Sequence, residues 1–423
     1  MRICVTSFGS LGDVLPYIAV GQRLQQRGHE IVFATLDRFA GQVTEAGLRF
    51  VSLGVAWDDA AFDAMMAEVV ATKNPIRQGR IIFERTHHAV LSAVPRLTDV
   101  VSDCDVVFTH VYHLAGYAAA VRAQRPFASG HLITSMIPSL APGPTQRDLG
   151  PLGNRARRWL LDTVIARLTD PAVNRLLRES GCAAKRHAMR RGLHSQRLNL
   201  VAVSQTLRPR DSSWPPHYAL TGAWRLAFQN DVSAHETALP EPLQRFLASG
   251  SAPVFATLGS TTGMDARRLR DALVDGAKRA GARVIVQAGW AGLDVVPSAN
   301  VFLLPGFVPY QALLPHVRGV IHHGGAGTSA ECFHAGIPSA VVWSIADQRA
   351  WATLAVRLGV CSGALHHSQL DAAWVAERIT ALDLHRAAAS ALAVKLNAEP
   401  DGASEAARLL EEEFTPGRRH HRE

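Results

Sequence analysis

The chain has 423 residues, of which 48% are hydrophobic and 19% are charged. This composition excludes an intrinsically disordered chain, and the length indicates two or three domains. The formal net charge is +8, and an excess of the same size lies in the segment 155–197, which holds eleven Lys or Arg and three Asp or Glu (11 − 3).

The sequence also argues against a membrane-spanning protein and against a nucleic-acid-binding protein. No run of 18 or more apolar residues occurs, so no segment is predicted to span a membrane. The basic segment has one aromatic residue, Trp159, and no recognised nucleic-acid motif, so we expect no nucleic-acid partner. A strand-like run starts at Arg2 without a leader, and the five cysteines form no Cys-x-x-Cys pair; both features favour a reduced, cytoplasmic compartment.

The first part of the chain alternates strand and helix patterns. Strands are predicted at 2–7, 30–35 and 49–53, and a helix at 14–27. This rhythm predicts a parallel sheet with helices on both faces, and such sheets bind ligands at the carboxyl ends of their strands. Asp13 lies at such an end, directly before the helix, where an aspartate is typical of an N-cap.

Polar residues also flank the next predicted strand, at 106–108. It follows a long helical pattern at 56–98. Asp103 and Asp105 precede the strand, and we interpret them as a strand cap rather than a metal site. His110 ends the strand, where its residue type alone fits a hydrogen-bonded structural histidine.

Two segments before the middle of the chain are candidates for contact with other molecules. The segment 133–144 contains three prolines and is predicted as a loop, so His131 and Ser135 beside it are candidates for acceptor binding. The segment 155–197 has a largely helical, amphipathic pattern. It is either a solvated basic face over a core contact or a surface that meets anionic lipid or an acidic acceptor.

A second series of strands follows a linker predicted at 226–250. Its first strand is expected at 253–258, and two more are expected at 284–287 and 301–304. Ser260 and Thr261 lie in a glycine-containing turn that leads from this first strand into a helix. Their hydroxyl and backbone N–H groups are therefore candidates for phosphate binding.

The most informative stretch follows a short apolar strand that ends near residue 321. His323, Gly325 and Gly327 separate this strand from a helical pattern that begins at Thr328. Glycines let backbone N–H groups approach a ligand, and a helix N-terminus adds unpaired N–H groups and a positive dipole end. The pattern predicts a phosphate-binding loop with His323 as a further donor, and Glu331 on the helix is placed to hold ribose hydroxyls.

Asp347 and Gln348 follow the next predicted strand, at 339–343. One carboxylate and one amide at this place suit the hydroxyl groups of a sugar. The alternative is an ordinary glycine-rich turn between strand and helix, with an unrelated Asp-Gln pair on the surface.

Together these motifs resemble the donor-binding signature of family 1 glycosyltransferases. The resemblance is to the bacterial branch, with sterol glucosyltransferases, glycopeptide-antibiotic glycosyltransferases and the rhamnolipid rhamnosyltransferase. Glu331 follows His323 by 8 positions (331 − 323), and Asp347 follows it by 24 (347 − 323). In the family, the residue at the position of His323 contacts the diphosphate, that of Glu331 the ribose and that of Asp347 the sugar. The resemblance implies the α/β GT-B fold with two Rossmann-like domains, and an inverting, nucleotide-sugar-dependent reaction without a metal or other cofactor.

The resemblance also assigns roles outside the signature. Asp13 lies where the family has the base that deprotonates the acceptor hydroxyl, and His110 lies where a carboxylate often orients that base. We therefore predict an Asp13–His110 pair, and which of the two takes the proton stays open. Phe307 and Val308 lie where relatives bind the nucleobase, and because Phe307 replaces a tryptophan of plant relatives, the choice between UDP and dTDP stays open.

The expected function is transfer of a hexose from a UDP- or dTDP-sugar to a hydroxyl of a lipophilic small molecule or lipid. The alternatives are a nucleotide-sugar epimerase on the same fold and a non-catalytic partner protein that binds nucleotide-sugars. If the segment 155–197 meets lipid, the contact would be peripheral, at the inner face of the membrane. The expected organisation is an acceptor domain at 1–225, a linker at 226–250, a donor domain at 251–397, a helix that returns to the first domain at 398–415 and a disordered tail at 416–423.

Overall fold

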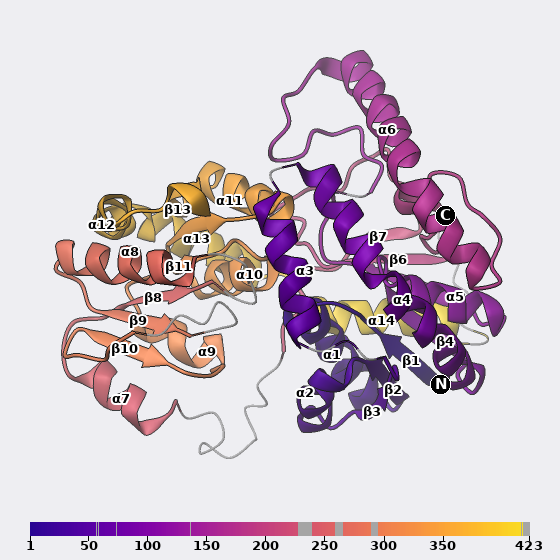
Figure 1. Ribbon diagram of the computed structural model, residues 1–423, viewed down its shortest axis with the longest axis horizontal. Coiled ribbons are helices and arrows are strands. Elements are labelled where there is room, and N and C mark those ends of the chain that lie inside the picture. Colours follow the sequence, from indigo (N-terminus) through magenta and orange to yellow (C-terminus); the bar gives the residue numbers. More distant parts are fainter. Residues whose placement is uncertain are drawn as a thin grey trace. The chain divides into compact units, whose positions relative to one another are not determined.

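The computed structural model forms two compact α/β units, each with its own hydrophobic core (Figure 1). The first unit holds residues 1–65, 74–226 and 399–423, and the second holds 66–73 and 227–398. The segment 66–73 thus groups with the second unit, although it lies inside the range expected for the first domain. The residues that the structure describes are 1–55, 57, 59–72, 74–135, 137–226, 239–258, 265–288, 295–415 and 417.

The first unit is built on a seven-stranded sheet in which all paired strands are parallel, as the alternating pattern predicted. The central strands β1 and β4 are buried along almost their whole length, as expected of a parallel sheet that helices cover on both faces. The strand order is β3-β2-β1-β4-β5-β6-β7. The strands are β1 (Arg2–Thr6), β2 (Glu30–Thr35), β3 (Arg49–Ser52), β4 (Val106–His110), β5 (Phe127–His131), β6 (Leu198–Val201) and β7 (Tyr218–Leu220).

Seven α-helices lie wholly or partly in the first unit among its described residues. The helix expected across 155–197 begins earlier, at Gly150, and ends at Glu179, because the chain turns at Gly181 with a positive φ of 74°. The helices are α1 (Leu11–Gln26), α2 (Ala40–Glu45), α3 (Asp59–Ala71), α4 (Pro75–Ser102), α5 (Leu114–Arg122), α6 (Gly150–Glu179) and α14 (Gly402–Phe414).

The last helix, α14, packs against α1 in the first unit (Figure 1), although the intervening chain belongs to the second. Its apolar face joins the core of the first unit, with Leu410 almost fully buried. Arg23 pairs with Asp401 at 3.1 Å, and Arg197 pairs with Glu413 at 2.9 Å. Gly402 permits the close approach at the start of α14, because a Cβ there would overlap with the backbone at Gly222.

The second unit has a six-stranded sheet, again parallel throughout, in the order β10-β9-β8-β11-β12-β13. The predicted strands at 284–287, 301–304 and 339–343 have the bounds that the structure gives them. The strands are β8 (Val254–Thr257), β9 (Val284–Gln287), β10 (Val301–Leu304), β11 (Gly319–His322), β12 (Ser339–Trp343) and β13 (Cys361–His366).

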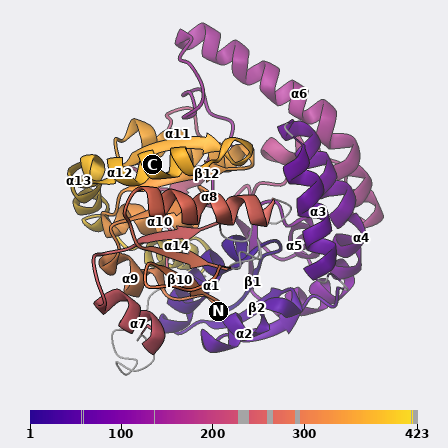
Figure 2. The ribbon, with the colours of Figure 1, turned by 60° about the vertical axis from the view of Figure 1, so that its left-hand side comes forward.

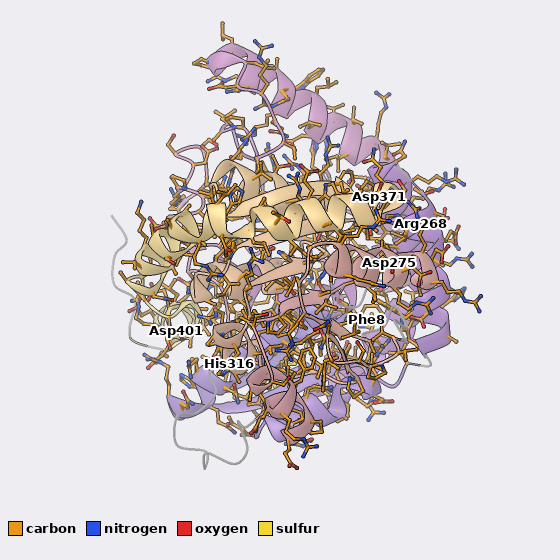
Figure 3. All side chains as sticks on the ribbon, turned by 90° about the vertical axis from the view of Figure 1, so that its left-hand side faces the viewer. Phe8, Arg268, Asp275, His316, Asp371 and Asp401 are labelled. Atoms are coloured by element: carbon orange, nitrogen blue, oxygen red, sulfur yellow. The ribbon has the colours of Figure 1, made fainter. Side chains whose placement is uncertain are left out.

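Helices of the second unit pack on this sheet and on one another. Gly276 lets α8 approach α12, because a Cβ at 276 would overlap with Val375. Arg268 and Asp371 lie close together on this helix pair (Figure 3), and Arg268 donates to the carbonyl of Leu370 at 3.1 Å. The α-helices are α7 (Glu241–Ala248), α8 (Ala266–Arg279), α9 (Tyr310–Leu313), α10 (Ala326–Ala335), α11 (Ala346–Arg357), α12 (Ala372–Ala381) and α13 (Arg386–Asn397).

Candidate active site

Asp13 lies in the first unit, at the carboxyl end of the sheet. It is the third residue of α1 and not the residue before the helix, because α1 begins at Leu11. Its Oδ2 accepts hydrogen bonds from Ser10 N at 2.8 Å and Ser10 Oγ at 2.9 Å. The carboxylate therefore stabilises the helix start through one oxygen, and no described residue donates a hydrogen bond to Oδ1, which is left for a ligand.

The turn before α1 is shaped around this carboxylate. Gly9 has a φ of 145°, and a Cβ at this position would overlap with Asp13 Oδ2. Ser7 Oγ donates to the backbone carbonyl of Asp13 at 2.7 Å. Asp13 can therefore serve both as a helix cap, through Oδ2, and as the predicted base, through Oδ1.

His110 ends β4, and 5% of its surface is exposed. Its Nδ1 accepts a hydrogen bond from the backbone N–H of Tyr112 at 3.2 Å. Burial lowers the pKa of His110, and the nearby Asp13 carboxylate opposes this shift. The imidazole is therefore neutral near pH 7 and carries its proton on Nε2, so this nitrogen can donate a hydrogen bond but cannot accept the acceptor's proton.

A second histidine, His113, lies in the same region and was not predicted as a site residue. Its Nδ1 lies 3.1 Å from Thr6 Oγ1, and Thr6 uses its only hydroxyl proton to donate to the carbonyl of Ala34. Nδ1 of His113 must therefore be the donor, which leaves a lone pair on Nε2. In the described part of the chain this buried nitrogen has no hydrogen-bond partner.

The two residues predicted to bind the acceptor differ in exposure. Ser135 is exposed, and its carbonyl accepts a hydrogen bond from Arg190 at 2.7 Å. His131 is 1% exposed; its Nε2 lies 3.3 Å from Asn199 Oδ1, and its ring packs on His194. The acceptor contact of His131 stays a prediction, and its ring lies in a buried polar cluster.

The predicted phosphate loop lies at the carboxyl end of the second sheet, between β11 and α10. Gly325 is the N-cap of α10, and Ser329 is the first helical residue whose N–H reaches a backbone carbonyl of the cap, that of Gly325 at 2.9 Å. The N–H groups of Ala326, Gly327 and Thr328 precede that bond, so the helix offers them no partner. Gly327 is exposed, and a Cβ there would meet no atom within 4 Å.

His323 lies directly over this loop, because a Cβ on Gly325 would overlap with its Nε2. Burial lowers the pKa of His323 to about 4, and a backbone contact with Thr257 opposes the shift. A neutral imidazole at this point is a hydrogen-bond donor to an anion held by the loop amides.

Gly324 determines the path of the loop, and its replacement is expected to lower the stability of the second unit. Its φ is 83°, and a Cβ would lie 2.8 Å from Val341 Cγ1 and 2.9 Å from the carbonyl oxygen of Gln348. We expect Gly324→Ala to destabilise the second unit by about 2–3 kcal/mol through strain and overlap with backbone. Urea unfolding measures this loss. Gly281→Ala is the control for positive φ alone, because its φ is 61° and its Cβ would meet nothing. Equal losses in both variants would show that the loop is not tightly packed.

A polar network that the sequence did not reveal lies next to the loop, at the ends of β8 and β9. Thr257 Oγ1 donates to Gln287 Oε1 at 2.7 Å, and the Tyr310 hydroxyl donates to the same oxygen at 3.1 Å. Gln287 Nε2 in turn donates to the carbonyl of Gly306 at 3.0 Å. The network fixes the segment that precedes Phe307.

The residues predicted to bind the nucleoside are Phe307, Val308 and Glu331. Phe307 is 54% exposed with its ring tilted on Tyr310 at 5.8 Å, so one face is open for stacking. Val308 is 4% exposed, and its side chain packs in a hydrophobic cluster of the second unit. Burial raises the pKa of Tyr310 to about 12, and the Glu331 carboxylate adds to the shift, which places Glu331 near this ring.

The predicted sugar-binding pair lies in the first turn of α11. Gln348 is buried, and its Oε1 accepts hydrogen bonds from Ser344 N at 2.8 Å and Ile345 N at 3.3 Å. The side-chain oxygen of Gln348 is therefore committed to the helix start, and only its Nε2 can serve a sugar hydroxyl. Asp347 is partly exposed beside it.

The structure does not test two further predictions, the phosphate contacts of Ser260 and Thr261 and the independence from a metal. Ser260 and Thr261 lie outside the described residues. Among the residues that are described, no three His, Cys, Asp or Glu side chains gather as a metal site would require. Independence from a metal stays a prediction.

Buried neutral histidines give a prediction for stability against pH. Burial lowers the pKa of His113 and His322 to about 3 and that of His194 and His323 to about 4. The unfolded chain binds these protons below about pH 6.5, so stability is full above that pH and falls by about 1.4 kcal/mol per group and pH unit below it. We expect the midpoint of urea unfolding to fall strongly between pH 7 and pH 5, and His194→Gln to flatten the slope. A midpoint that stays constant over this range would contradict the neutral state of these rings.

Two family models match the chain. Residues 3–100 match the glycosyltransferase family 28 N-terminal domain. Residues 272–412 match the erythromycin biosynthesis protein CIII-like, C-terminal domain.

The chain is also similar to several characterised proteins. O-mycaminosyltylonolide 6-deoxyallosyltransferase of Streptomyces fradiae is 30% identical over 382 residues, which cover 86% of this chain and 85% of that protein. Sterol 3-beta-glucosyltransferase UGT80A2 of Arabidopsis thaliana is 27% identical over 376 residues, which cover 83% of this chain and 56% of that protein. The crystal structure of the Streptomyces sp. SF2575 glycosyltransferase SsfS6, complexed with thymidine diphosphate, has a TM-score of 0.64 at 19% identity and covers 97% of this chain and 99% of SsfS6.

Two units with parallel sheets and the likeness to solved glycosyltransferase structures define the GT-B fold, which confirms the predicted fold class. The chain belongs to the family 1 glycosyltransferases, as its signature predicted, and it is therefore an enzyme that transfers a sugar.

Proposed function

We propose that this glycosyltransferase moves a hexose from a UDP- or dTDP-sugar to a hydroxyl of a lipophilic small-molecule or lipid acceptor, with inversion at the anomeric carbon. The observation that carries the proposal is the loop before α10, where the amides of Ala326, Gly327 and Thr328 have no helical partner. The thymidine diphosphate in the SsfS6 structure supports a nucleoside diphosphate as the ligand.

The donor diphosphate binds at the N-terminus of α10. The loop amides and the helix dipole hold its charge, and His323 donates one more hydrogen bond from a neutral imidazole. The same groups stabilise the charge that grows on the diphosphate as the bond to the sugar breaks. These groups supply the stabilisation that other enzymes draw from a metal ion, so the proposed reaction is independent of one.

The rest of the donor extends from this loop in two directions. The nucleobase stacks on the open face of Phe307 and meets the backbone at Val308, while Glu331 holds the ribose hydroxyls. The sugar hydroxyls meet Asp347 and the Nε2 of Gln348, because the oxygen of Gln348 is used within the protein.

The acceptor is activated in the first unit. Asp13 takes the hydroxyl proton through Oδ1, since Oδ2 is held by Ser10. The acceptor oxygen then attacks the anomeric carbon from the face opposite the departing diphosphate, which inverts the configuration. His110 does not take the proton but donates from Nε2, and we assign it the role of orienting Asp13 or the acceptor.

This division of roles gives a prediction for His110. We expect His110→Ala to lower kcat by about 10- to 100-fold, and His110→Gln to recover part of it, because glutamine retains an N–H donor. Steady-state kinetics with a fixed donor measures both variants. If His110→Gln is as slow as His110→Ala, then donation from this position is not what matters.

A lipophilic acceptor agrees with the names of two relatives, one of which glycosylates a tylonolide and the other a sterol. Two further points stay predictions: the cytoplasmic location, and a peripheral contact of the segment 155–197 with a membrane.

The proposal is tested by incubating the enzyme with UDP- and dTDP-hexoses, with and without a panel of lipophilic alcohols, and with EDTA in a parallel series. We expect release of nucleoside diphosphate and an acceptor mass increased by one hexose only when both substrates are present, and no effect of EDTA. Isomerisation of the donor without acceptor would identify an epimerase instead. Binding of the donor without any turnover, across a broad acceptor panel, would favour a non-catalytic role.

A further inference from the structure

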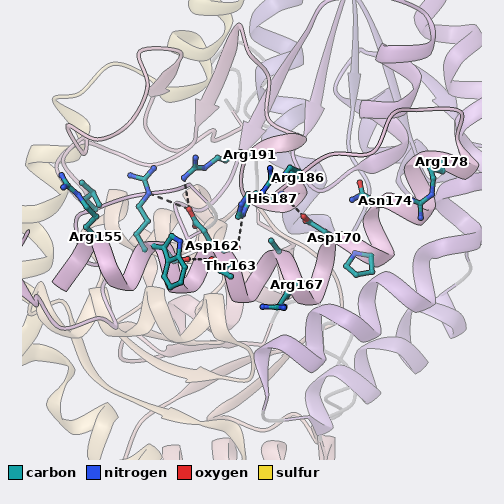
Figure 4. Close-up of a pocket in the computed structure, with 15 residues that line it drawn as sticks. Arg155, Asp162, Thr163, Arg167, Asp170, Asn174, Arg178, Arg186, His187 and Arg191 are labelled. Carbon is teal, nitrogen blue, oxygen red and sulfur yellow. Dashed lines mark hydrogen bonds and ion pairs between the residues drawn. The ribbon is translucent and has the colours of Figure 1, made fainter. Parts of the chain in front are cut away.

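A groove lies on α6 of the first unit, far along the sequence from Asp13 (Figure 4). It has a volume of about 1090 Å³, and residues from α6 and from the short turn η2 (Ala188–Gly192) and its flanks line it. Figures 1 and 2 both show the N-terminal half of α6 extending away from the sheet of its own unit. Six arginines line the groove: Arg155, Arg158, Arg167, Arg178, Arg186 and Arg191.

The carboxylates of the groove are already engaged. Asp162 pairs with Arg191 at 3.0 Å (Figure 4). It also pairs with Arg190, which does not line the groove, at 2.8 Å. Asp170 accepts hydrogen bonds from the backbone N–H groups of His187 and Ala188. Four of the six arginines form no ion pair among the described residues, so the groove carries an uncompensated positive charge: Arg155, Arg167, Arg178 and Arg186.

An apolar ridge adjoins this charge at the N-terminal half of α6. Leu152 is 80% exposed and Trp159, which lines the groove, is 69% exposed. Seven residues separate them, so both project from the same side of the helix. Leu149 and Leu160 are each 54% exposed near them, and this group of four is unusual for a surface in contact with water alone.

We propose that this surface binds a membrane that carries anionic lipid. Lipid phosphates would meet the unpaired arginines, while Trp159 and Leu152 enter the boundary between headgroups and acyl chains, where tryptophan is favoured. The contact is peripheral, because no helix among the described residues is both long and apolar enough to cross a bilayer. An acidic protein would satisfy the arginines but would have to cover the four apolar side chains as well.

The proposal does not rest on the identity of the donor or acceptor, because the surface shares no residue with the candidate active site. It would bring the enzyme to the phase in which a lipophilic acceptor concentrates.

Flotation of the full chain with phospholipid vesicles tests the proposal. We expect binding to vesicles of phosphatidylcholine and phosphatidylglycerol, weaker binding at high salt, and little binding to phosphatidylcholine alone. Arg155→Glu with Arg167→Glu should weaken binding at least about tenfold, and Leu152→Ser with Trp159→Ser should do the same. The positions of these four substitutions are at least partly exposed, and thermal melting checks that each variant folds.

A matched control uses the second unit. Leu384 is 83% exposed and Arg357 is exposed, so Leu384→Ser with Arg357→Glu combines one substitution of each kind on the surface of the other unit. This control should bind vesicles like the unaltered chain. Equal weakening by the control, or absence of binding to anionic vesicles, would overturn the proposal.

Quenching by brominated lipids supplies a readout for one side chain. If Trp159 enters the boundary, anionic vesicles with brominated chains should quench part of the tryptophan emission, and Trp159→Phe should lose that part. Quenching that is the same in both proteins would overturn the assignment. Tight binding of poly-glutamate without binding to vesicles would overturn the proposal of a membrane contact and would identify an acidic protein as the partner.

Discussion

Asp13→Asn should lower kcat by about 10²- to 10⁴-fold, because the amide cannot take a proton from the acceptor hydroxyl. The substitution keeps the shape of the side chain, and its oxygen can still accept the hydrogen bonds from Ser10 N and Oγ. The start of α1 is therefore preserved. The affinity for UDP or dTDP, measured by calorimetry, should change by less than about twofold, since the diphosphate loop lies in the other unit.

The control for this prediction is another aspartate of the first unit. Asp105 accepts a hydrogen bond from the backbone N–H of Arg2 at 2.7 Å and so holds the start of the neighbouring strand β1. Asp105→Asn should leave turnover close to that of the unaltered enzyme. If Asp13→Asn also retains near-normal turnover, Asp13 acts as a helix cap alone and the base lies elsewhere.

That other base would be sought first at His113. Its Nε2 has a lone pair and no partner among the described residues, and Nδ1 is fixed by Thr6. Burial lowers the pKa of His113 to about 3, however, so it would be a weak base near neutral pH.

His323→Ala should weaken the binding of UDP or dTDP about tenfold, which corresponds to about 1.4 kcal/mol, and should lower kcat further. The imidazole is expected to donate to a charge that increases as the diphosphate leaves, so the loss is larger in the transition state than in the bound donor. Because burial lowers the pKa of His323 to about 4, the imidazole stays neutral between pH 6 and pH 8, and the ratio of the affinities of the unaltered enzyme and His323→Ala should stay constant over this range. Calorimetry at several pH values, together with steady-state kinetics, measures these effects.

His316→Ala is the matched control for this substitution. His316 lies in the second unit and is exposed, so its loss should change neither affinity nor turnover. A steep rise in affinity as the pH falls from 8 to 6 in the unaltered enzyme, but not in His323→Ala, would mean that the imidazole binds as a cation. An unchanged affinity and turnover in His323→Ala would remove the imidazole from the diphosphate site.

The sequence predicted most of the strands but missed β5 and β13, in which polar residues and glycine interrupt the apolar run, and the short β7. Strand β5, Phe127–His131, contains Ser129, Gly130 and His131, yet it is fully buried from Ala128 onwards. Gly130 is required because a Cβ there would overlap with the Tyr17 hydroxyl. Packing against a neighbouring element decides such a strand, and the hydrophobic pattern of the strand itself does not contain that information.

The same limit applies to the candidate site. Glycine spacing predicted the loop before α10 because the requirement there is local: bare amides at a helix start. The network of Thr257, Gln287 and Tyr310 could not be predicted, since three different elements contribute one hydrogen-bonding group each. The proton position on His110 likewise depends on the backbone of Tyr112, which only the folded turn brings to Nδ1.

The most direct measurement is a crystal structure of the enzyme with bound UDP or dTDP. The two phosphate groups should lie within hydrogen-bond distance of the amides of Ala326, Gly327 and Thr328, with the imidazole of His323 beside them. Density for the phosphates at any other place, with this helix start left to water, would contradict the account.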